Sequence, residues 1–363
     1  MHGGTPLPPG VLQIPPDHLS TMPHPTITSP LIALRRELTV AEYAEGVLTG
    51  DRVTLGRAIT LVESTLPAHE AMAQELLLQL LPHTGKALRL GITGIPGAGK
   101  STFIEALGGR LTAAGHKVAV LAIDPSSTIS GGSILGDKTR MQELSANPNA
   151  FIRPSPSSGT LGGVTRKTRE TLFVCEAFGF DVVIIETVGT GQSETVVDDM
   201  VDCFLLLMVA GAGDELQGIK RGVLELADIV AVNKADGDNV QRAELACRQY
   251  ATGLHFMRPK VQSWTPQAVV CSARTGRGLD ELWTLVEAHR RALTHAGDFT
   301  THRQQQLVRW MWSMINERLL AAMRAHPAVK ERILPLELAV TEGKVTASQA
   351  AAALLEAFGV DTM

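Results

Sequence analysis

The chain has 363 residues, 44% of them hydrophobic, which is enough for one large α/β domain with appended segments. Its formal net charge is −4 at pH 7 and it has no dense run of basic residues, so nucleic acid is not expected as its main partner. Its four cysteines lie far apart without a CxxC pair, which indicates buried thiols in a reducing compartment. No apolar run approaches the roughly 20 residues that span a membrane, so no membrane partner is expected.

The first 86 residues fall into two parts. Residues 1–30 contain eight prolines and are expected to form a disordered, extended tail. No Lys or Arg precedes Arg35, which argues against a secretory or mitochondrial leader and predicts a cytoplasmic protein. Residues 31–86 are expected to form a helical N-terminal extension, because apolar side chains recur at helical spacing in 52–64 and again in 68–81.

Residues 94–102 have the pattern of a phosphate-binding loop: Gly94 is followed, after four residues, by Gly99, Lys100 and Ser101. The apolar run 87–93 indicates a buried strand before the loop, and 102–111 indicates a helix after it. In this setting backbone N–H groups and the helix N-terminus hold phosphate, Lys100 reaches the outer phosphates, and the Ser101 hydroxyl ligates Mg²⁺. The residues predicted to contact the triphosphate are Gly94, Ile95, Pro96, Gly97, Ala98, Gly99, Lys100, Ser101 and Thr102.

A second motif predicts that the base is guanine. The apolar run 227–232 ends in Asn233, Lys234, Ala235 and Asp236, which places polar groups beyond the carboxyl end of a strand. The Asp236 carboxylate can accept two hydrogen bonds from guanine, and adenine would leave it unpaired. Lys234 is expected along the base and ribose, and Asn233 is expected to tie this segment to the phosphate loop. Downstream, Ser272, Ala273 and Arg274 follow another apolar run, where a backbone N–H can meet guanine O6.

Acidic residues that follow other strands are candidates for a Mg²⁺ shell. Asp124 follows the apolar run 118–123, Glu186 follows 181–185, and Asp137 lies in a Gly/Ser-rich stretch between them. Because Mg²⁺ takes one or two carboxylates together with phosphate oxygens and water, we expect Ser101 as a direct ligand and these three acids around it, partly through water. With Lys100 and Glu186, Gln192 completes the predicted catalytic group as the residue that orients the attacking water; an ordinary polar role in a loop is the alternative for Gln192.

Residues 87–293 alternate strands and helices, which predicts a P-loop GTPase domain with a mostly parallel, doubly wound sheet. Helical extensions are expected on both sides of it. The cations Arg166, Lys167 and Arg169 open one helix and are expected on a solvated face; a phosphate clamp is the alternative. Residues 294–363 are expected to be helical and to pack on the GTPase domain, on a second subunit, or on both.

Two helices are predicted in this C-terminal part, at residues 302–326 and 347–358. The longer one carries an apolar stripe that could serve either as intramolecular core or as a subunit interface. The stripe consists of Leu307, Trp310, Met311, Met314 and Ile315.

Seven motifs in this order resemble the MeaB/ArgK family, whose members are G-protein chaperones of adenosylcobalamin-dependent acyl-CoA mutases such as methylmalonyl-CoA mutase. The resemblance runs from about residue 45 to about residue 325. Its motifs lie at residues 94–102, 122–127, 136–141, 153–163, 186–194, 211–220 and 233–236.

The resemblance implies a GTPase of the SIMIBI class that uses GTP/GDP and Mg²⁺ and acts as a homodimer. It implies that the protein binds a mutase, gates the loading of adenosylcobalamin by an adenosyltransferase, and protects or reactivates the mutase. It also implies that loop 211–220 is a third switch that meets the mutase, with Asp214, Glu215 and Lys220 as coupling residues. Hydrolysis is expected to be slow alone and faster with the partner, because no arginine finger can be identified, and such a finger can contribute a factor of about 10³–10⁵ in rate.

Two alternatives belong to other functional classes. A nickel-insertion GTPase would need Cys or His ligands near the phosphate loop, and Cys175 and Cys203 do not supply that spacing. A P-loop kinase would need an acceptor-substrate pocket, which the sequence does not indicate.

Overall fold

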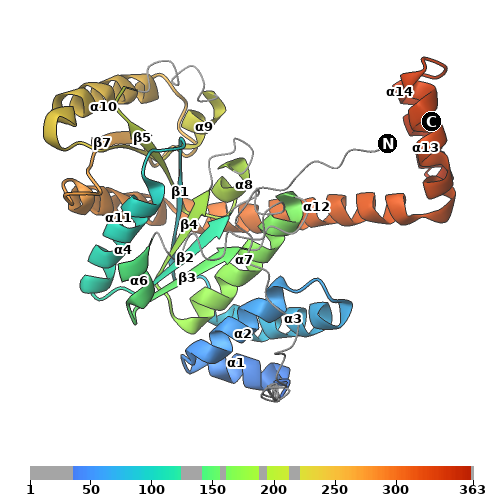
Figure 1. The fold of residues 1–363 in the computed structure, drawn as a ribbon, viewed down its shortest axis with the longest axis horizontal. Coiled ribbons are helices and arrows are strands. Elements are labelled where there is room, and N and C mark those ends of the chain that lie inside the picture. Colours follow the sequence, from blue (N-terminus) through green and yellow to red (C-terminus); the bar gives the residue numbers. More distant parts are fainter. Residues whose placement is uncertain (1–35, 124–140, 156–160, 188–193, 212–220, 361–363) are drawn as a thin grey trace, which may run out of the picture. The chain divides into compact units, whose positions relative to one another are not determined.

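The computed structural model describes residues 36–123, 141–155, 161–187, 194–211 and 221–360 (Figure 1). The described residues from Thr39 onward belong to one compact unit. The predicted tail, residues 1–30, lies outside the described residues. The four-part division of the chain into tail, extension, GTPase domain and C-terminal extension stays a prediction.

The centre of this unit is a seven-stranded sheet with the order β3-β2-β4-β1-β5-β6-β7 (Figure 1). All six pairings between neighbouring strands are parallel, which confirms the predicted fold class. Strands that are buried on both faces are continuous apolar runs, so these strands stand out in the sequence. Their bounds are β1 Leu88–Gly94, β2 Val118–Ile123, β3 Ala150–Ser155, β4 Val182–Thr187, β5 Cys203–Val209, β6 Ile229–Asn233 and β7 Gln267–Val270.

Helices cover both faces of the sheet. On one face, Leu205 of β5 shares a core with Phe103 of α4 and Leu282 of α11. The next residue, Leu206, points to the opposite face and packs with Tyr250 of α10. Helix α7 contacts β2, β3 and β4, and α8 contacts β1 and β4. The bounds are α4 Lys100–Ala113, α6 Gln142–Ala146, α7 Leu161–Phe178, α8 Glu194–Asp198, α9 Arg221–Leu226, α10 Val240–His255 and α11 Leu279–Ala296.

The N-terminal helices pack on α7. They are α1 Val40–Leu48, α2 Arg52–Glu63 and α3 Pro67–Leu80, followed by the 3-10 turn η1 Leu81–His83. A capping box of Thr39 and Glu42 begins α1, and the Asp51 side chain caps α2.

The expectation of a solvated, charged face on α7 is wrong. Arg166 bonds to Glu70 at 2.9 Å, Lys167 donates to the carbonyl of Ser64, and Arg169 is only 4% exposed. The N-terminal helices cover this face, so its cations meet carboxylates and the carbonyls at the end of α2, where positive charge is favourable. Arg166 and Lys167 therefore fasten the N-terminal helices to α7.

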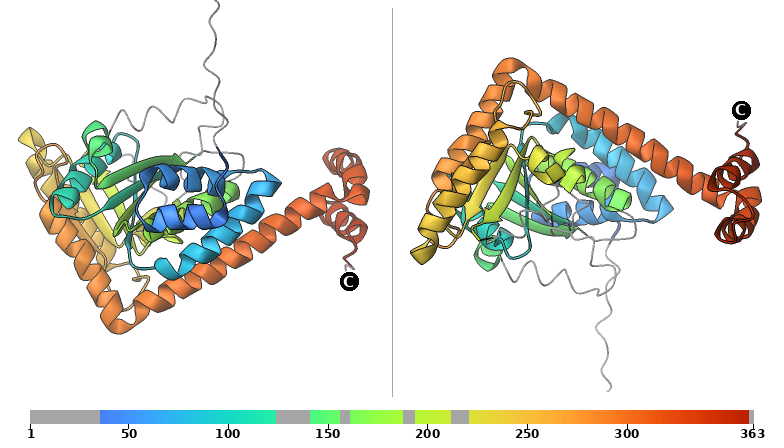
Figure 2. Two further views of the ribbon diagram at one scale, coloured as in Figure 1. Left: turned by 90° about the horizontal axis from the view of Figure 1, so that it is seen from below. Right: turned by 90° about the horizontal axis from the view of Figure 1, so that it is seen from above.

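The C-terminal part contains three helices: α12 Asp298–Ala325, α13 Pro327–Thr341 and α14 Ala347–Ala357. Gly297, with a left-handed φ of 79°, makes the sharp corner between α11 and α12 (Figure 2). Helix α13 was not predicted, because Pro335 within it is a residue that normally ends a helix. Among the described residues, no helix is long and apolar enough to cross a membrane.

The predicted stripe on α12 divides between two environments. The Trp310 ring lies 6.0 Å from that of Phe173 on α7, whereas Leu307, Met311 and Ile315 are 46%, 44% and 42% exposed. Within this chain the stripe is therefore only partly core.

Candidate functional site

The phosphate-loop segment follows the central strand β1, and α4 begins within it at Lys100. A Cβ on Gly94 would lie 2.2 Å from the carbonyl oxygen of Leu207 on β5, so only glycine fits there. Gly97 and Gly99 have left-handed φ angles of 79° and 87°, which other residues rarely adopt. The glycines thus permit a tight turn that aims backbone N–H groups at one point, as phosphate binding requires.

The Lys100 ammonium lies inside this turn. Its Nζ donates to the carbonyl oxygens of Gly94 at 2.8 Å and Ile95 at 3.3 Å. Burial lowers the pKa of Lys100, while the nearby carboxylates of Glu186 and Glu194 act in the opposite direction. A partly buried ammonium beside a glycine turn is well placed to bind the oxygens of a phosphate group.

Ser101 and Glu186 lie together, as the predicted metal site requires. The Ser101 hydroxyl donates to Glu186 Oε1 at 3.3 Å, and Glu186 is only 5% exposed near the end of β4. Next to it, the Thr187 hydroxyl donates to that of Thr93 at 2.7 Å, which joins the ends of β4 and β1. A hydroxyl and a carboxylate are oxygen donors of the kind that Mg²⁺ prefers, so these residues fit that ion.

The other predicted metal, water-orienting and switch residues fall outside the described part of the chain. They are Asp124, Asp137, Gln192, Asp214, Glu215 and Lys220.

Glu194 is a residue of this site that the sequence analysis did not identify. It is the first residue of α8, is 6% exposed, and acts electrostatically on Lys100 together with Glu186. The signal available in the sequence was its place at the end of the 186–194 motif.

Asn233 connects the base-recognition segment to the phosphate loop, as the sequence predicts. Its Nδ2 donates to the carbonyl of Ala98 at 2.9 Å, and its Oδ1 accepts from the backbone N–H of Ala273 at 3.0 Å. One side chain that is 2% exposed thereby holds three separate segments of the chain together.

The remaining predicted base contacts lie around this bridge. Lys234 has a φ of 60°, an unusual value for a residue with a side chain, and its Cε lies 4.0 Å from the position of a Cβ on Gly99. The Asp236 carboxylate accepts a hydrogen bond from the buried Ser272 hydroxyl. Arg274 is exposed. Asp236, Ser272 and Ala273 are thus assembled at one edge of the sheet, near the phosphate loop.

Comparison with known proteins agrees with this geometry. A family model described as methylmalonyl Co-A mutase-associated GTPase MeaB matches residues 55–328. The chain is 51% identical to "GTPase ArgK" of Escherichia coli over 78% of this chain and 86% of that protein. It is 47% identical to the mouse (Mus musculus) protein "Methylmalonic aciduria type A homolog, mitochondrial", over 86% of this chain and 78% of the mouse protein.

A solved structure has the same fold. The crystal structure of a protein named "LAO/AO transport system kinase" superposes with a TM-score of 0.74 at 40% identity, covering 90% of this chain and all of that one. Membership of a GTPase family implies that a guanine nucleotide is bound. From its motifs, its fold and these relatives, the chain belongs to the MeaB family of methylmalonyl-CoA mutase-associated GTPases.

Proposed function

We propose that this protein hydrolyses GTP in the service of an adenosylcobalamin-dependent acyl-CoA mutase. The observation that carries the proposal is the Asn233 bridge, which joins a phosphate loop to a guanine-selective segment in a chain of this family. The bridge supports GTP as the nucleotide because it joins the segment that contains Asp236 to the segment that contains Lys100.

Each residue has a part in the proposed chemistry. Lys100 stabilises negative charge on the outer phosphates, and Ser101 and Glu186 hold Mg²⁺, directly or through water. Asp124 and Asp137 complete the shell. Gln192 orients the attacking water. Mg²⁺ held by these residues would supply positive charge that offsets the negative charge developing on the phosphate during hydrolysis.

The proposed biological role is that of a chaperone. The protein gates the loading of adenosylcobalamin by an adenosyltransferase and protects or reactivates the mutase. Loop 211–220, with Asp214, Glu215 and Lys220, reports the nucleotide state to the partner. The description of the family and the methylmalonic aciduria name of the mouse relative support this role.

A homodimer through α12 is also part of the proposal. Val308, Trp312, Ile315 and Leu319 are 53%, 57%, 42% and 55% exposed, and they repeat at intervals of four, three and four residues. This interval places apolar side chains along one seam of a helix, the arrangement that packs against a second helix in a coiled coil. A second copy of the chain supplies a matching seam.

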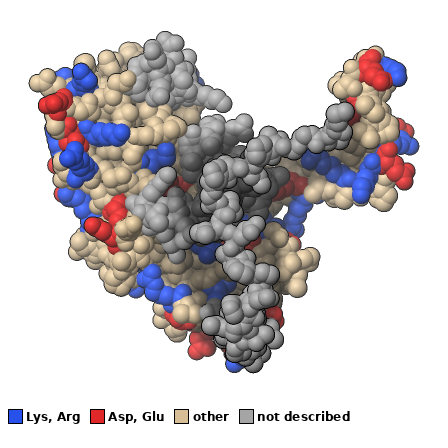
Figure 3. All heavy atoms as spheres, viewed as in Figure 1, with Lys and Arg blue, Asp and Glu red and all other residues tan. Residues whose placement is uncertain are grey.

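The surface charge supports a protein partner more than a nucleic acid. On the described part of the face in Figure 3, acidic and basic side chains are interspersed over the sheet domain and the C-terminal helices.

Nucleotide-dependent binding to a mutase tests this function. The protein is immobilised and a purified adenosylcobalamin-dependent acyl-CoA mutase is passed over it with GDP or with a non-hydrolysable GTP analogue. We expect the two nucleotides to give different affinities, and the Lys100→Ala variant to lose the difference because it no longer holds the triphosphate. Identical affinities for the unmodified protein in both nucleotides would contradict the proposal.

A further inference from the structure

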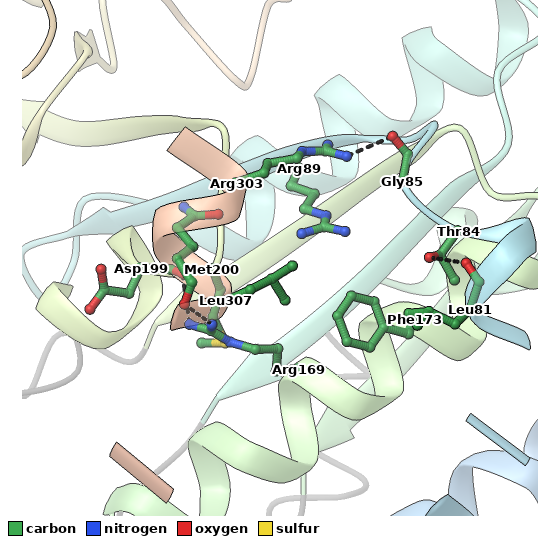
Figure 4. A pocket seen from close by; sticks show the side chains of 11 residues that line it. Leu81, Thr84, Gly85, Arg89, Arg169, Phe173, Asp199, Met200, Arg303 and Leu307 are labelled. Carbon is green, nitrogen blue, oxygen red and sulfur yellow. Dashed lines mark hydrogen bonds between the residues drawn. The ribbon is translucent and has the colours of Figure 1, made fainter. Parts of the chain in front are cut away.

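A second cavity lies away from the nucleotide site, beside the amino-terminal end of β1. It has a volume of about 140 Å³ and is lined by residues of η1, α7 and α12 together with Arg89 of β1 (Figure 4). The phosphate loop follows the other end of the same strand. None of the roles proposed above uses this cavity.

Two of the three arginines that line the cavity have carboxylate partners. Arg89 donates to both oxygens of Glu176, at 2.8 Å and 2.9 Å. Arg303 donates to both oxygens of Asp202, at 2.7 Å each. These bidentate pairs neutralise both guanidinium groups.

Arg169 is held differently. It is 4% exposed, and its Nη1 and Nη2 donate to the backbone carbonyls of Gln306 at 3.0 Å and Asp199 at 2.7 Å. Its Nε is buried and finds no hydrogen-bond partner among the residues that the structure describes. A buried donor without a partner costs about 1–3 kcal/mol, and more for a charged group, so this arginine is suited to an added acceptor.

Among the described residues, the hydrogen bonds of Arg169 go to backbone carbonyls and not to a carboxylate. The pKa of Arg169 is lowered to about 10, and burial is the largest cause. Repulsion from Arg89 and Arg309 lowers this pKa further, whereas attraction to Asp199 raises it. Asp199 already pairs with Arg309 at 2.8 Å. Within this set of described, interacting residues, four guanidinium groups accompany three carboxylates: Arg89, Arg169, Arg303 and Arg309 with Glu176, Asp199 and Asp202.

The rest of the wall is largely apolar. Phe173, Leu81, Met200 and Leu307 line the space between the arginines, and Figure 4 shows Arg89, Phe173 and Arg169 around it. An apolar cavity of about 150 Å³ can hold benzene, a ligand of six carbon atoms. A ligand with one negative charge and a short apolar chain would match the charge and the lining of this cavity.

We propose that the cavity binds a small organic monoanion, a carboxylate of about six non-hydrogen atoms, with its oxygens on Arg169 and its chain against Phe173 and Leu307. Arg169 also holds the carbonyls of Asp199, just after α8, and of Gln306 on α12. An occupant therefore stabilises the junction of three helices, and its binding raises the melting temperature of the protein.

The test uses butyrate, a six-atom monocarboxylate, on nucleotide-free full-length protein. Melting temperature is measured by scanning fluorimetry against sodium butyrate, inorganic phosphate and sodium chloride at matched ionic strength. We expect a saturable rise with butyrate alone. Because the protein is free of nucleotide, the result is independent of whether it hydrolyses GTP.

Three variants test whether butyrate binds in this cavity. Arg169→Gln removes the charge, and Leu307→Trp fills the cavity from its rim while leaving the Arg169 hydrogen bonds in place. Each is expected to weaken butyrate binding at least tenfold, an effect of about 1.4 kcal/mol. Arg318→Gln removes an exposed cation from the same helix and is expected to leave binding unchanged.

Three results would overturn the proposal. They are a butyrate effect no larger than that of chloride, an effect that persists in Leu307→Trp, and a saturable response to phosphate that depends on Arg169 in place of the butyrate response.

Discussion

The side-chain amide of Asn233 donates a 2.9 Å hydrogen bond to the backbone carbonyl of Ala98 in the phosphate-loop segment. Because its oxygen also accepts from the Ala273 backbone N–H, Asn233 links the phosphate segment to both segments predicted to meet the base. We expect Asn233→Ala to reduce the free energy of unfolding by about 1–3 kcal/mol, because two buried groups lose their partner. The affinity for GTP falls as well, since the segments are no longer held together.

Urea unfolding and calorimetric titration with GTP measure these two effects. Asn239→Ala is a matched control, because the Asn239 side chain makes an exposed hydrogen bond, to Lys234, in the same region. An Asn233→Ala protein as stable as the control would show that the bridge has no energetic role.

Base selection should depend on Asp236. We expect Asp236→Asn to weaken GTP binding and to shift preference toward xanthosine triphosphate, because an amide can donate where a carboxylate only accepts. Competition between the two nucleotides for the variant measures the shift. An unchanged order of preference would remove Asp236 from the base site.

His289 should make stability sensitive to mild acid. It is 1% exposed, and burial is the main cause that holds its pKa below the usual 6.5. Its contribution to stability is therefore present above pH 6.5 and is lost as pH falls toward the folded-state pKa, since only the unfolded chain takes up the proton. The slope from one such group is at most about 1.4 kcal/mol per pH unit.

Urea unfolding from pH 7.5 to 5.5 checks this for the unmodified protein and for His289→Phe. We expect the unmodified protein to lose stability relative to the variant as the pH falls. If the free energy of unfolding of the two proteins changed with pH in parallel, His289 would have the same pKa in the folded and unfolded states.

The seam on α12 should govern the oligomeric state. We expect the unmodified protein to have twice the chain mass of 38.8 kDa by light scattering, and Trp312→Glu to have the mass of one chain. A charge in the middle of an apolar seam would be buried without a partner in the dimer. Leu338→Glu, at an exposed position of α13, is the control that stays dimeric. A dimeric Trp312→Glu protein would place the interface elsewhere.

Local patterns predicted strands β1, β2, β4 and β6, because these strands are buried on both faces. The run Val118–Ile123 is a strand with the predicted bounds. Helix α13 was missed because Pro335 breaks the local pattern while the rest of the helix continues around it. The environment of Arg166 and Arg169 was mispredicted because their partners come from distant segments, such as Glu70 and Gln306, that no local pattern reveals.

In the candidate site too, contacts that follow from a sequence motif were predicted, whereas contacts that depend on helix packing were not. The link from Asn233 to the phosphate loop was predicted, because Asn233 and the loop each follow a strand and so lie at one sheet edge. Glu194 received no role from the sequence, since its proximity to Lys100 depends on how α8 packs beneath β1.

The most direct test of the central claim is the rate of phosphate release from GTP, measured with and without a purified adenosylcobalamin-dependent acyl-CoA mutase. We predict slow release by the protein alone, a severalfold faster rate with the mutase, and no release above background by Lys100→Ala in either case. No stimulation by any such mutase, together with transfer of the phosphoryl group to an acceptor other than water, would contradict the account.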